Sequence, residues 1–160
     1  MKNVFKALLL IMLIISISLI SSCKSPDPWT DEEYFVRNAI CSNLTNFKNP
    51  ASVKVISAHQ GNDKYVSVKI SASNSYGGTV TEEYYIFTED AYLPSGKLIA
   101  RKRQMENADD LLTRLGKSYS ATEFSELIDF IKQKPTKSIA YSSEAINKVL
   151  DSYKSSMGWN

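Results

Sequence analysis

The chain has 160 residues, with 19 Lys and Arg against 17 Asp and Glu, one His and two Cys. This length suits a single domain, and an apolar fraction of 43% with 22% charged residues argues against wholesale disorder, a collagen-like fibre or a disulfide-dense scaffold. The formal charge of +2 is unevenly placed, because the first six residues carry two lysines and no acid.

The first 20 residues have the pattern of an export signal. Lys2 and Lys6 form a positive start, and residues 7–20 are apolar apart from two serines. A permanent transmembrane helix needs about 20 apolar residues. The apolar run here has the length of a signal peptide instead.

Residues Ile20-Ser21-Ser22-Cys23 follow this run directly and resemble the lipobox of bacterial lipoproteins. The resemblance implies that the thiol of Cys23 receives a diacylglycerol and that the signal peptide, residues 1–22, is cleaved between Ser22 and Cys23. Two or three acyl chains hold a protein stably on a membrane where one would not. The alternatives are a type I cleavage site that contains Cys by chance, or an uncleaved anchor. Each of them also leaves the rest of the chain outside the cytoplasm.

Removing the signal peptide takes away Lys2 and Lys6 and no acid, which leaves 17 basic and 17 acidic side chains. A basic protein that tracks nucleic acid by long-range attraction is therefore disfavoured, and we expect no nucleic-acid partner. Residues 23–30, the lipidated Cys23 and a short tether with two prolines, should keep the domain close to the membrane.

The hydrophobic period then predicts an α+β domain over residues 31–116 and a helical C-terminal extension, 117–160, packed on the same domain. A helix over 31–47 ends at Asn49-Pro50. Four strands follow, and the short turns between the first three imply an antiparallel meander on which this helix packs. The predicted strands span 52–59, 64–73, 79–88 and 97–102, and the predicted later helices span 109–115, 120–134 and 143–156.

The turn around Tyr76 sets the register of the second and third strands. On one face it pairs Ala72 with Val80, Ile70 with Glu82, Val68 with Tyr84 and Val66 with Ile86; on the other it pairs Lys69 with Glu83, Ser67 with Tyr85 and Tyr65 with Phe87. The first face is apolar apart from Glu82 and should meet the first helix. The second face is polar in the middle and aromatic at one end.

This aromatic end is the candidate binding surface. Tyr65, Tyr85 and Phe87 on the sheet, with Tyr76 at the loop tip, would present amphipathic rings to a peptide or a glycan. The alternative is that a helix of segment 120–134 or 143–156 covers this face as a second core layer.

The titratable residues show no catalytic or metal-binding pattern. His59 has no neighbouring ligands at the spacing of a metal site, and Cys41 has the character of a small buried apolar residue. A Cys41–His59 pair would lack a third group to orient it. We expect no catalytic residue, no metal and no cofactor.

Four positive charges, Lys97, Arg101, Lys102 and Arg103, lie close together near the fourth strand. They are candidates for contact with anionic headgroups. A register with the fourth strand beside the third instead places Lys102 opposite Glu83 and Arg103 opposite Glu82, and this cross-strand pairing is the favoured interpretation.

Residues 49–55, 65–73 and 74–85 are together similar to a small domain of uncharacterised secreted and lipoprotein chains of low-GC Gram-positive bacteria. That resemblance brings no catalytic residue and no ligand. We expect a protein held on the extracytoplasmic side of a bacterial membrane by a lipid on Cys23, acting as a non-catalytic binding or accessory module for an envelope protein or glycan. The alternatives are an envelope hydrolase whose active site the sequence does not reveal, and a structural or stress-related surface lipoprotein.

Replacement of Cys23 by Ala should abolish metabolic labelling with a palmitate analogue and release the chain from the membrane fraction, because the thiol is the expected acyl acceptor. Cys41→Ala is the matched control and should keep the label. A palmitate signal that survives Cys23→Ala would overturn the lipobox assignment.

Overall fold

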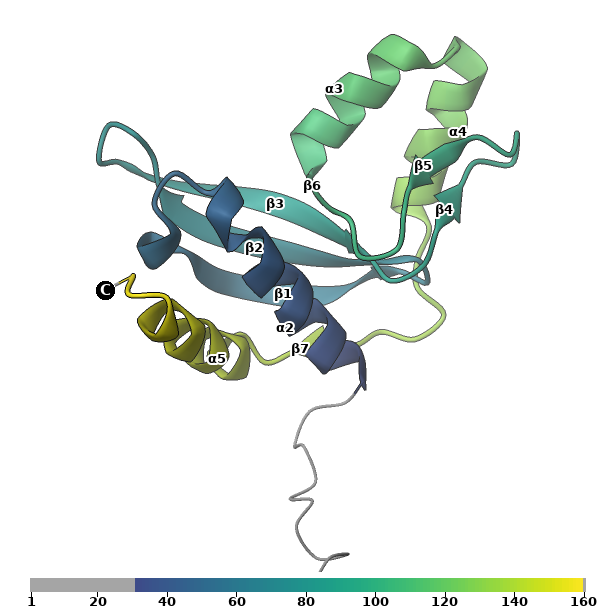
Figure 1. Ribbon diagram of the computed structural model, residues 1–160. Coiled ribbons are helices and arrows are strands. Elements are labelled where there is room, and N and C mark those ends of the chain that lie inside the picture. Colours follow the sequence, from purple (N-terminus) through teal and green to yellow (C-terminus); the bar gives the residue numbers. More distant parts are fainter. Residues whose placement is uncertain (1–30, 160) are drawn as a thin grey trace, which may run out of the picture. The chain divides into compact units, whose positions relative to one another are not determined.

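The structure is a computed structural model that describes residues 31–159, so the predictions for residues 1–30 lie outside the described residues. Four α-helices and two short 3-10 helices surround an antiparallel sheet (Figure 1). The helices are α2 (Asp31–Asn43), η1 (Leu44–Asn46), η2 (Pro50–Ser52), α3 (Ala108–Ser118), α4 (Ala121–Lys132) and α5 (Ser143–Ser156). The strands are β1 (Lys54–Asn62), β2 (Tyr65–Ser73), β3 (Thr79–Phe87), β4 (Ala91–Tyr92), β5 (Leu98–Ala100), β6 (Met105–Asn107) and β7 (Ala140–Tyr141). Within residues 31–159, no helix has the length and apolarity needed to cross a bilayer.

Five strands form one antiparallel sheet in the order β6-β3-β2-β1-β7. The prediction of a mixed domain with helices and an antiparallel sheet is therefore confirmed, but the four-stranded meander is wrong at its fourth strand. Segment 97–102 contains β5, which pairs with β4 in a separate two-stranded sheet. A turn in which Arg103 has a φ of 72° reverses the chain after β5, and β6 then lies against β3.

The predicted register of the β2–β3 hairpin is confirmed at every pair, from Tyr65 opposite Phe87 to Ala72 opposite Val80. Glu82 lies opposite Ile70, as expected. A short loop and an apolar pattern confined to one face leave little freedom in the pairing, because a slip by one residue would turn the apolar set to the other face.

One face of the sheet, here called the inner face, packs against α2 and α5. The buried residues of this layer are Val55, Ala58, Val66, Val68, Ile70 and Ile86 of the sheet and Val36, Ile40, Leu44, Ile146 and Leu150 of the helical segments. Helix α5 is also tied to β1, because the Asn147 amide accepts a hydrogen bond from the Val55 N–H and donates one to its carbonyl, both at 2.8 Å. The buried Lys154 donates to the Val53 carbonyl at 2.6 Å. Side chains of α5 therefore form hydrogen bonds with the main chain at the start of β1, where β7 does not pair with it.

The opposite, outer face is covered at its aromatic end by α3, α4 and the β4–β5 hairpin (Figure 1). This second buried cluster contains Tyr65, Tyr85, Phe87, Ala91, Leu93, Ile99, Ala100, Ala108, Leu111, Leu115 and Leu127. The end of α4 is held by the β1–β2 turn, where Asn62 donates to the Phe130 carbonyl at 2.8 Å and the Tyr65 hydroxyl to the Ile131 carbonyl at 2.9 Å. Asn62 and Tyr65 thus donate to two carbonyls in the last turn of α4, one of which, that of Phe130, also accepts from the Gln133 N–H at 3.3 Å.

Gly61→Ala should destabilise the fold by about 1–3 kcal/mol, because an added Cβ would lie 2.0 Å from the Tyr65 ring and force that buried ring to move. Gly78→Ala is the control, since its Cβ would come no closer than 3.4 Å to Asn74. Urea unfolding checks the pair of variants. Equal midpoints for Gly61→Ala and the unsubstituted protein would contradict the close packing of Tyr65 on the β1–β2 turn.

Candidate functional site

The predicted binding surface at the aromatic end is wrong. Tyr65, Tyr85 and Phe87 retain 3%, 7% and 0% of their exposure, because α3, α4 and the β4–β5 hairpin cover them. Tyr76 is 95% exposed at the hairpin tip. The second core layer that the sequence left open as an alternative is therefore present, and it includes the helix of segment 120–134.

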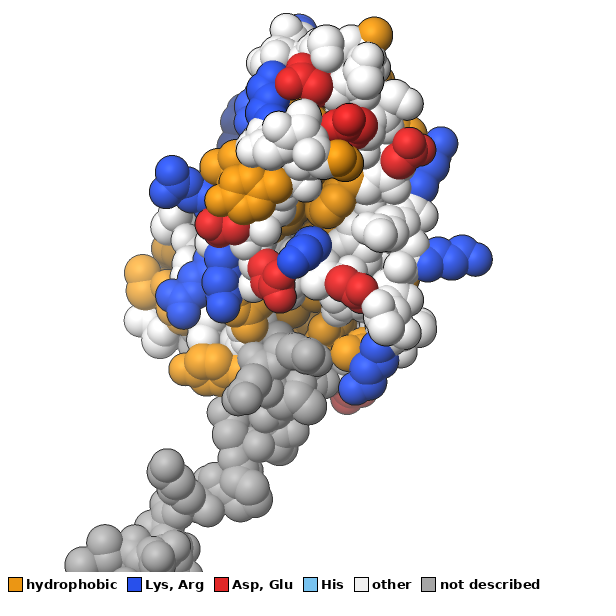
Figure 2. All heavy atoms as spheres, turned by 90° about the vertical axis from the view of Figure 1, so that its right-hand side faces the viewer, with side chains coloured by type: hydrophobic (Ala, Val, Ile, Leu, Met, Phe, Trp, Pro, Cys, Tyr) orange, Lys and Arg blue, Asp and Glu red, His pale blue; other side chains and the backbone are white. Residues whose placement is uncertain are grey.

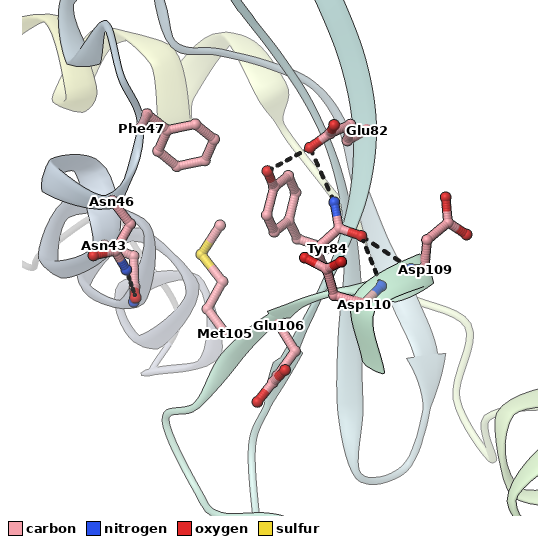
Figure 3. A pocket seen from close by; sticks show the side chains of 10 residues that line it. Asn43, Asn46, Phe47, Glu82, Tyr84, Met105, Glu106, Asp109 and Asp110 are labelled. Atoms are coloured by element: carbon pink, nitrogen blue, oxygen red, sulfur yellow. Dashed lines mark hydrogen bonds between the residues drawn. The ribbon is translucent and has the colours of Figure 1, made fainter. Parts of the chain in front are cut away.

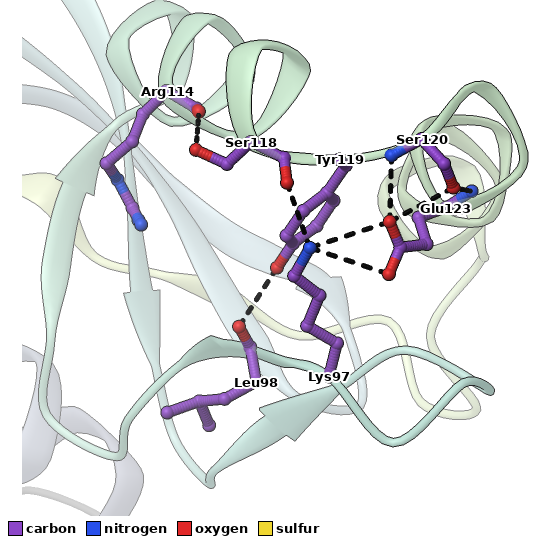
Figure 4. Close-up of polar contacts among 7 residues, drawn as sticks. All are labelled: Lys97, Leu98, Arg114, Ser118, Tyr119, Ser120 and Glu123. Carbon is purple, nitrogen blue, oxygen red and sulfur yellow. Dashed lines mark hydrogen bonds and ion pairs between the residues drawn. The ribbon is translucent and has the colours of Figure 1, made fainter.

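Lys97 of the predicted cationic cluster fastens the β4–β5 hairpin to the α3–α4 junction (Figure 4). Its ammonium group donates to the Ser118 carbonyl at 3.0 Å, lies 3.7 Å from the centre of the Tyr119 ring and approaches Glu123 at 3.5 Å. The Tyr119 hydroxyl donates to the Leu98 carbonyl at 3.0 Å. Lys97 is thus a packing and hydrogen-bonding residue of the second core layer.

The remaining cations do not form the predicted cross-strand pairs. Segment 97–102 pairs through β5 with β4 and not with β3, so Lys102 and Arg103 do not face Glu83 and Glu82 across a strand pair. On the face that Figure 2 shows, Lys and Arg side chains alternate with Asp and Glu and with separate hydrophobic patches. That face offers no continuous field of one sign.

His59 and Cys41 lie on opposite sides of the sheet. His59 is exposed and pairs with Ser67 in β1–β2, which places its side chain on the outer face, whereas Cys41 belongs to α2 on the inner side. Burial raises the pKa of the Cys41 thiol, with Arg37 and Lys154 opposing the shift. A raised pKa favours the unreactive thiol form. Among residues 31–159, no group of three His, Cys, Asp or Glu is arranged to hold a metal ion.

A polar groove runs along the inner face at the β3 edge, and we call it the edge groove. It consists of two hollows of about 500 and 320 Å³ that share Asn46, Phe47, Glu82 and Tyr84 as lining residues. The first hollow reaches the start of α3, and the second reaches the β2–β3 loop. Figure 3 shows Phe47, Met105 and Tyr84 facing one another in the first hollow, with Asp110 beside Tyr84. The carboxylates of Asp109 and Glu106 point away from these three side chains.

The wall of the groove opposite β3 comes from the chain that leaves α2. Helix α2 passes into η1 and then η2, whose Pro50 stands at its first position. This path brings the Phe47 ring to 5.5 Å from the Tyr84 ring, measured between centres. Lys48 donates to the Ser75 hydroxyl at 2.7 Å and so links this wall to the β2–β3 loop. The groove is therefore bounded by an aromatic contact in the middle and a hydrogen bond at one end.

The first hollow is acidic, with Glu82, Glu106, Asp109 and Asp110 among its lining residues. Glu106 pairs with Arg114 at 3.2 Å. No ion pair reaches the other three carboxylates within the part of the chain that the structure describes.

Glu82 is held in place by neutral donors. Its carboxylate accepts hydrogen bonds from the Tyr84 hydroxyl at 2.8 Å and from the Asn107 amide at 2.9 Å. Burial, together with this contact to Glu82, raises the pKa of Tyr84 to about 12. Tyr84 therefore remains a hydrogen-bond donor at neutral pH, and Glu82 keeps an uncompensated negative charge at the groove.

The start of α3 positions three of the residues that line the first hollow, namely Asn107, Asp109 and Asp110. The Asn107 side chain caps the helix by accepting from the amides of Asp109 and Asp110 at 3.0 and 3.2 Å. The two acids lie in the first turn, where negative charge is favoured by the helix dipole. Helix formation thus places both carboxylates beside the β3 edge.

The sequence carried one signal for this site. Glu82 stands out as the only acid on the apolar hairpin face, but its predicted partner, Arg103, forms no ion pair with it among the described residues. The sequence predicts Asn46 and Phe47 at the end of a longer helix and Asp109 at a helix start. Nothing local in the sequence brings these three segments together.

No protein-family model, no curated protein and no solved structure matches the chain. The site is therefore interpreted from its own residues.

Proposed function

We propose that the chain is a lipid-anchored extracytoplasmic protein whose domain binds a partner non-catalytically in the edge groove. The anchoring half of this proposal rests on the lipobox, Ile20-Ser21-Ser22-Cys23, directly after an apolar run. The binding half rests on the groove.

The observation that carries the binding proposal is the pair of adjoining hollows with shared walls and three carboxylates that no cation neutralises within the described residues. Charges left without a counterion beside a concave surface favour a ligand of opposite charge. Met105, Phe47 and Tyr84 add apolar area next to these carboxylates (Figure 3). The groove therefore combines apolar contact with directed hydrogen-bond acceptors, as binding sites commonly do.

The groups that line the groove are suited to holding a ligand. Glu82 already accepts two hydrogen bonds, and the Tyr84 phenol that donates one of them has a raised pKa. A general base acts on a nucleophile within hydrogen-bond reach. The first hollow, which holds Asp109 and Asp110, is lined by no Ser, Thr, Cys, Lys or His among the described residues, and the hydroxyls of Ser73 and Ser75 belong to the second hollow. This composition favours binding over acid–base chemistry.

A photo-crosslinking amino acid at Asn46, an exposed residue of the groove wall, should give a discrete adduct in intact cells that express the full chain. The same amino acid at Ser125, an exposed position of α4 outside the groove, is the control and should give none. Gel shifts of the membrane fraction provide the measurement.

Two results would count against the proposal. Identical adducts from both positions would indicate non-specific proximity at the membrane. The absence of any adduct at Asn46, with the chain normally anchored, would leave the groove without a partner in the cell.

A further inference from the structure

The edge of β3 next to the groove has unpaired main-chain groups. Alternate residues of a strand direct their N–H and C=O groups to opposite sides. Two hydrogen bonds just beyond the ends of the β2–β3 ladder show which residues of β3 face β2. The Asn74 N–H donates to the Gly78 carbonyl, and the Thr88 N–H donates to the Lys64 carbonyl, so both bonds join even-numbered residues in the register of the ladder. The even-numbered residues of β3 therefore bond to β2, and the odd-numbered residues point away from it.

The groups of Phe87 confirm this assignment, because its N–H donates to Gln104 at 3.0 Å and its carbonyl accepts from Arg103 at 2.8 Å, both on the β6 side. Strand β6 pairs only with Tyr84, Tyr85 and Ile86. Within residues 31–159, no strand pairs with the outward groups of Thr79 and Thr81. At Glu83 the pairing of Tyr84 with Asn107 directs the Ala108 N–H to the Glu83 carbonyl, so only the Glu83 N–H belongs to the unpaired stretch. We call residues 79–83 the open edge.

The open edge stops at β6 because the chain becomes helical there. Asn107 pairs with Tyr84 and at the same time caps α3, so the chain leaves the sheet at Ala108. Within residues 31–159, no other strand takes the position that a longer β6 would occupy beside residues 79–83. Five residues of strand extend for about 17 Å, which is enough for an added strand of ordinary length.

The side chains of an added strand would alternate between the two faces, and those opposite Glu82 would point to the inner face, where the edge groove lies. Glu82, Asp109 and Asp110 are the carboxylates without an ion-pair partner at that point. A basic side chain there would find complementary charge, while an acidic one would meet three like charges.

From this combination we propose that the partner of the edge groove is an extended, basic polypeptide segment. It pairs antiparallel or parallel with the open edge through the main chain of Thr79 and Thr81 and the N–H of Glu83, and it directs Lys or Arg side chains to Glu82, Asp109 and Asp110. Main-chain pairing supplies affinity in this mode of recognition, and alternate side chains supply specificity. The inference rests on the proposed function and names its class of partner.

A fluorescent peptide of about nine residues with alternating Thr and Lys tests this inference against the full chain purified in detergent. Binding is followed by fluorescence anisotropy. We expect saturable binding that weakens as salt is raised. A peptide with Glu in place of Lys should bind at least about tenfold more weakly because of like-charge repulsion. A Thr–Lys peptide that is N-methylated at alternate residues should lose a similar factor, since it has lost strand donors.

The matching change in the protein is Thr81→Pro, which removes an outward N–H at the open edge and leaves every bond to β2 intact. It should weaken binding about tenfold, whereas Ser125→Ala, at an exposed position of α4 outside the groove, should bind as the unsubstituted chain does. The N-methylated peptide keeps the test valid if the proline variant folds poorly, because that arm uses the unsubstituted chain.

Three results would overturn the inference. Equal binding of the parent and N-methylated peptides would mean that the groove binds without strand addition. A dimer that forms with rising concentration and is lost in Thr81→Pro would mean that a second copy of the chain occupies the edge. Absence of basic-peptide binding, with the Asn46 adduct still formed in cells, would reject the basic segment while the proposed function stands. Loss of both would reject the two proposals together.

Discussion

The fold depends on how the central strand β2 is buried. Its first four residues are buried on both faces of the sheet, and the rest of the strand is buried on one face only. Tyr65, Val66, Ser67 and Val68 are all buried, and from Lys69 onward the burial becomes one-sided. Successive strand residues point to opposite faces, so four consecutive buried residues require a cover on each side. Helices α2 and α5 provide one cover, and α3, α4 and the β4–β5 hairpin provide the other, at one end alone.

This uneven cover also explains where the edge groove lies. The helical part of the second layer begins with α3, directly after β6, and β6 ends after three residues because Asn107 caps the helix. The start of α3 therefore ends strand pairing along β3 and brings Asp109 and Asp110 to that point. Phe47 closes the other side, since the chain turns back at η2 after leaving α2. The start of α3 thus contributes both to the second core layer and to the edge groove.

Local features were predictable from the sequence, and long-range ones were not. The β2–β3 register follows from one short loop and one apolar face, which is why every predicted pair is confirmed. The prediction of the fourth strand is wrong because the reversal after β5 uses a positive φ at Arg103, and an arginine gives no sign of that conformation. The sequence marks Glu82 as an exception on its face, but the neighbours of Glu82 in the structure come from two other segments. The sequence does not predict the cover over Tyr65, because helical periodicity does not say which face of a sheet a helix will meet.

Hydrogen exchange of individual β3 amides, followed by NMR in the free protein, shows directly whether the β3 edge beside the groove is open. We expect an alternation, with slow exchange at Val80 and Glu82, which bond to β2, and fast exchange at Thr81 and Glu83, whose N–H groups face the open edge. Equal protection of all four amides would contradict it, because the outward groups would then be paired and the edge beside the groove would be closed.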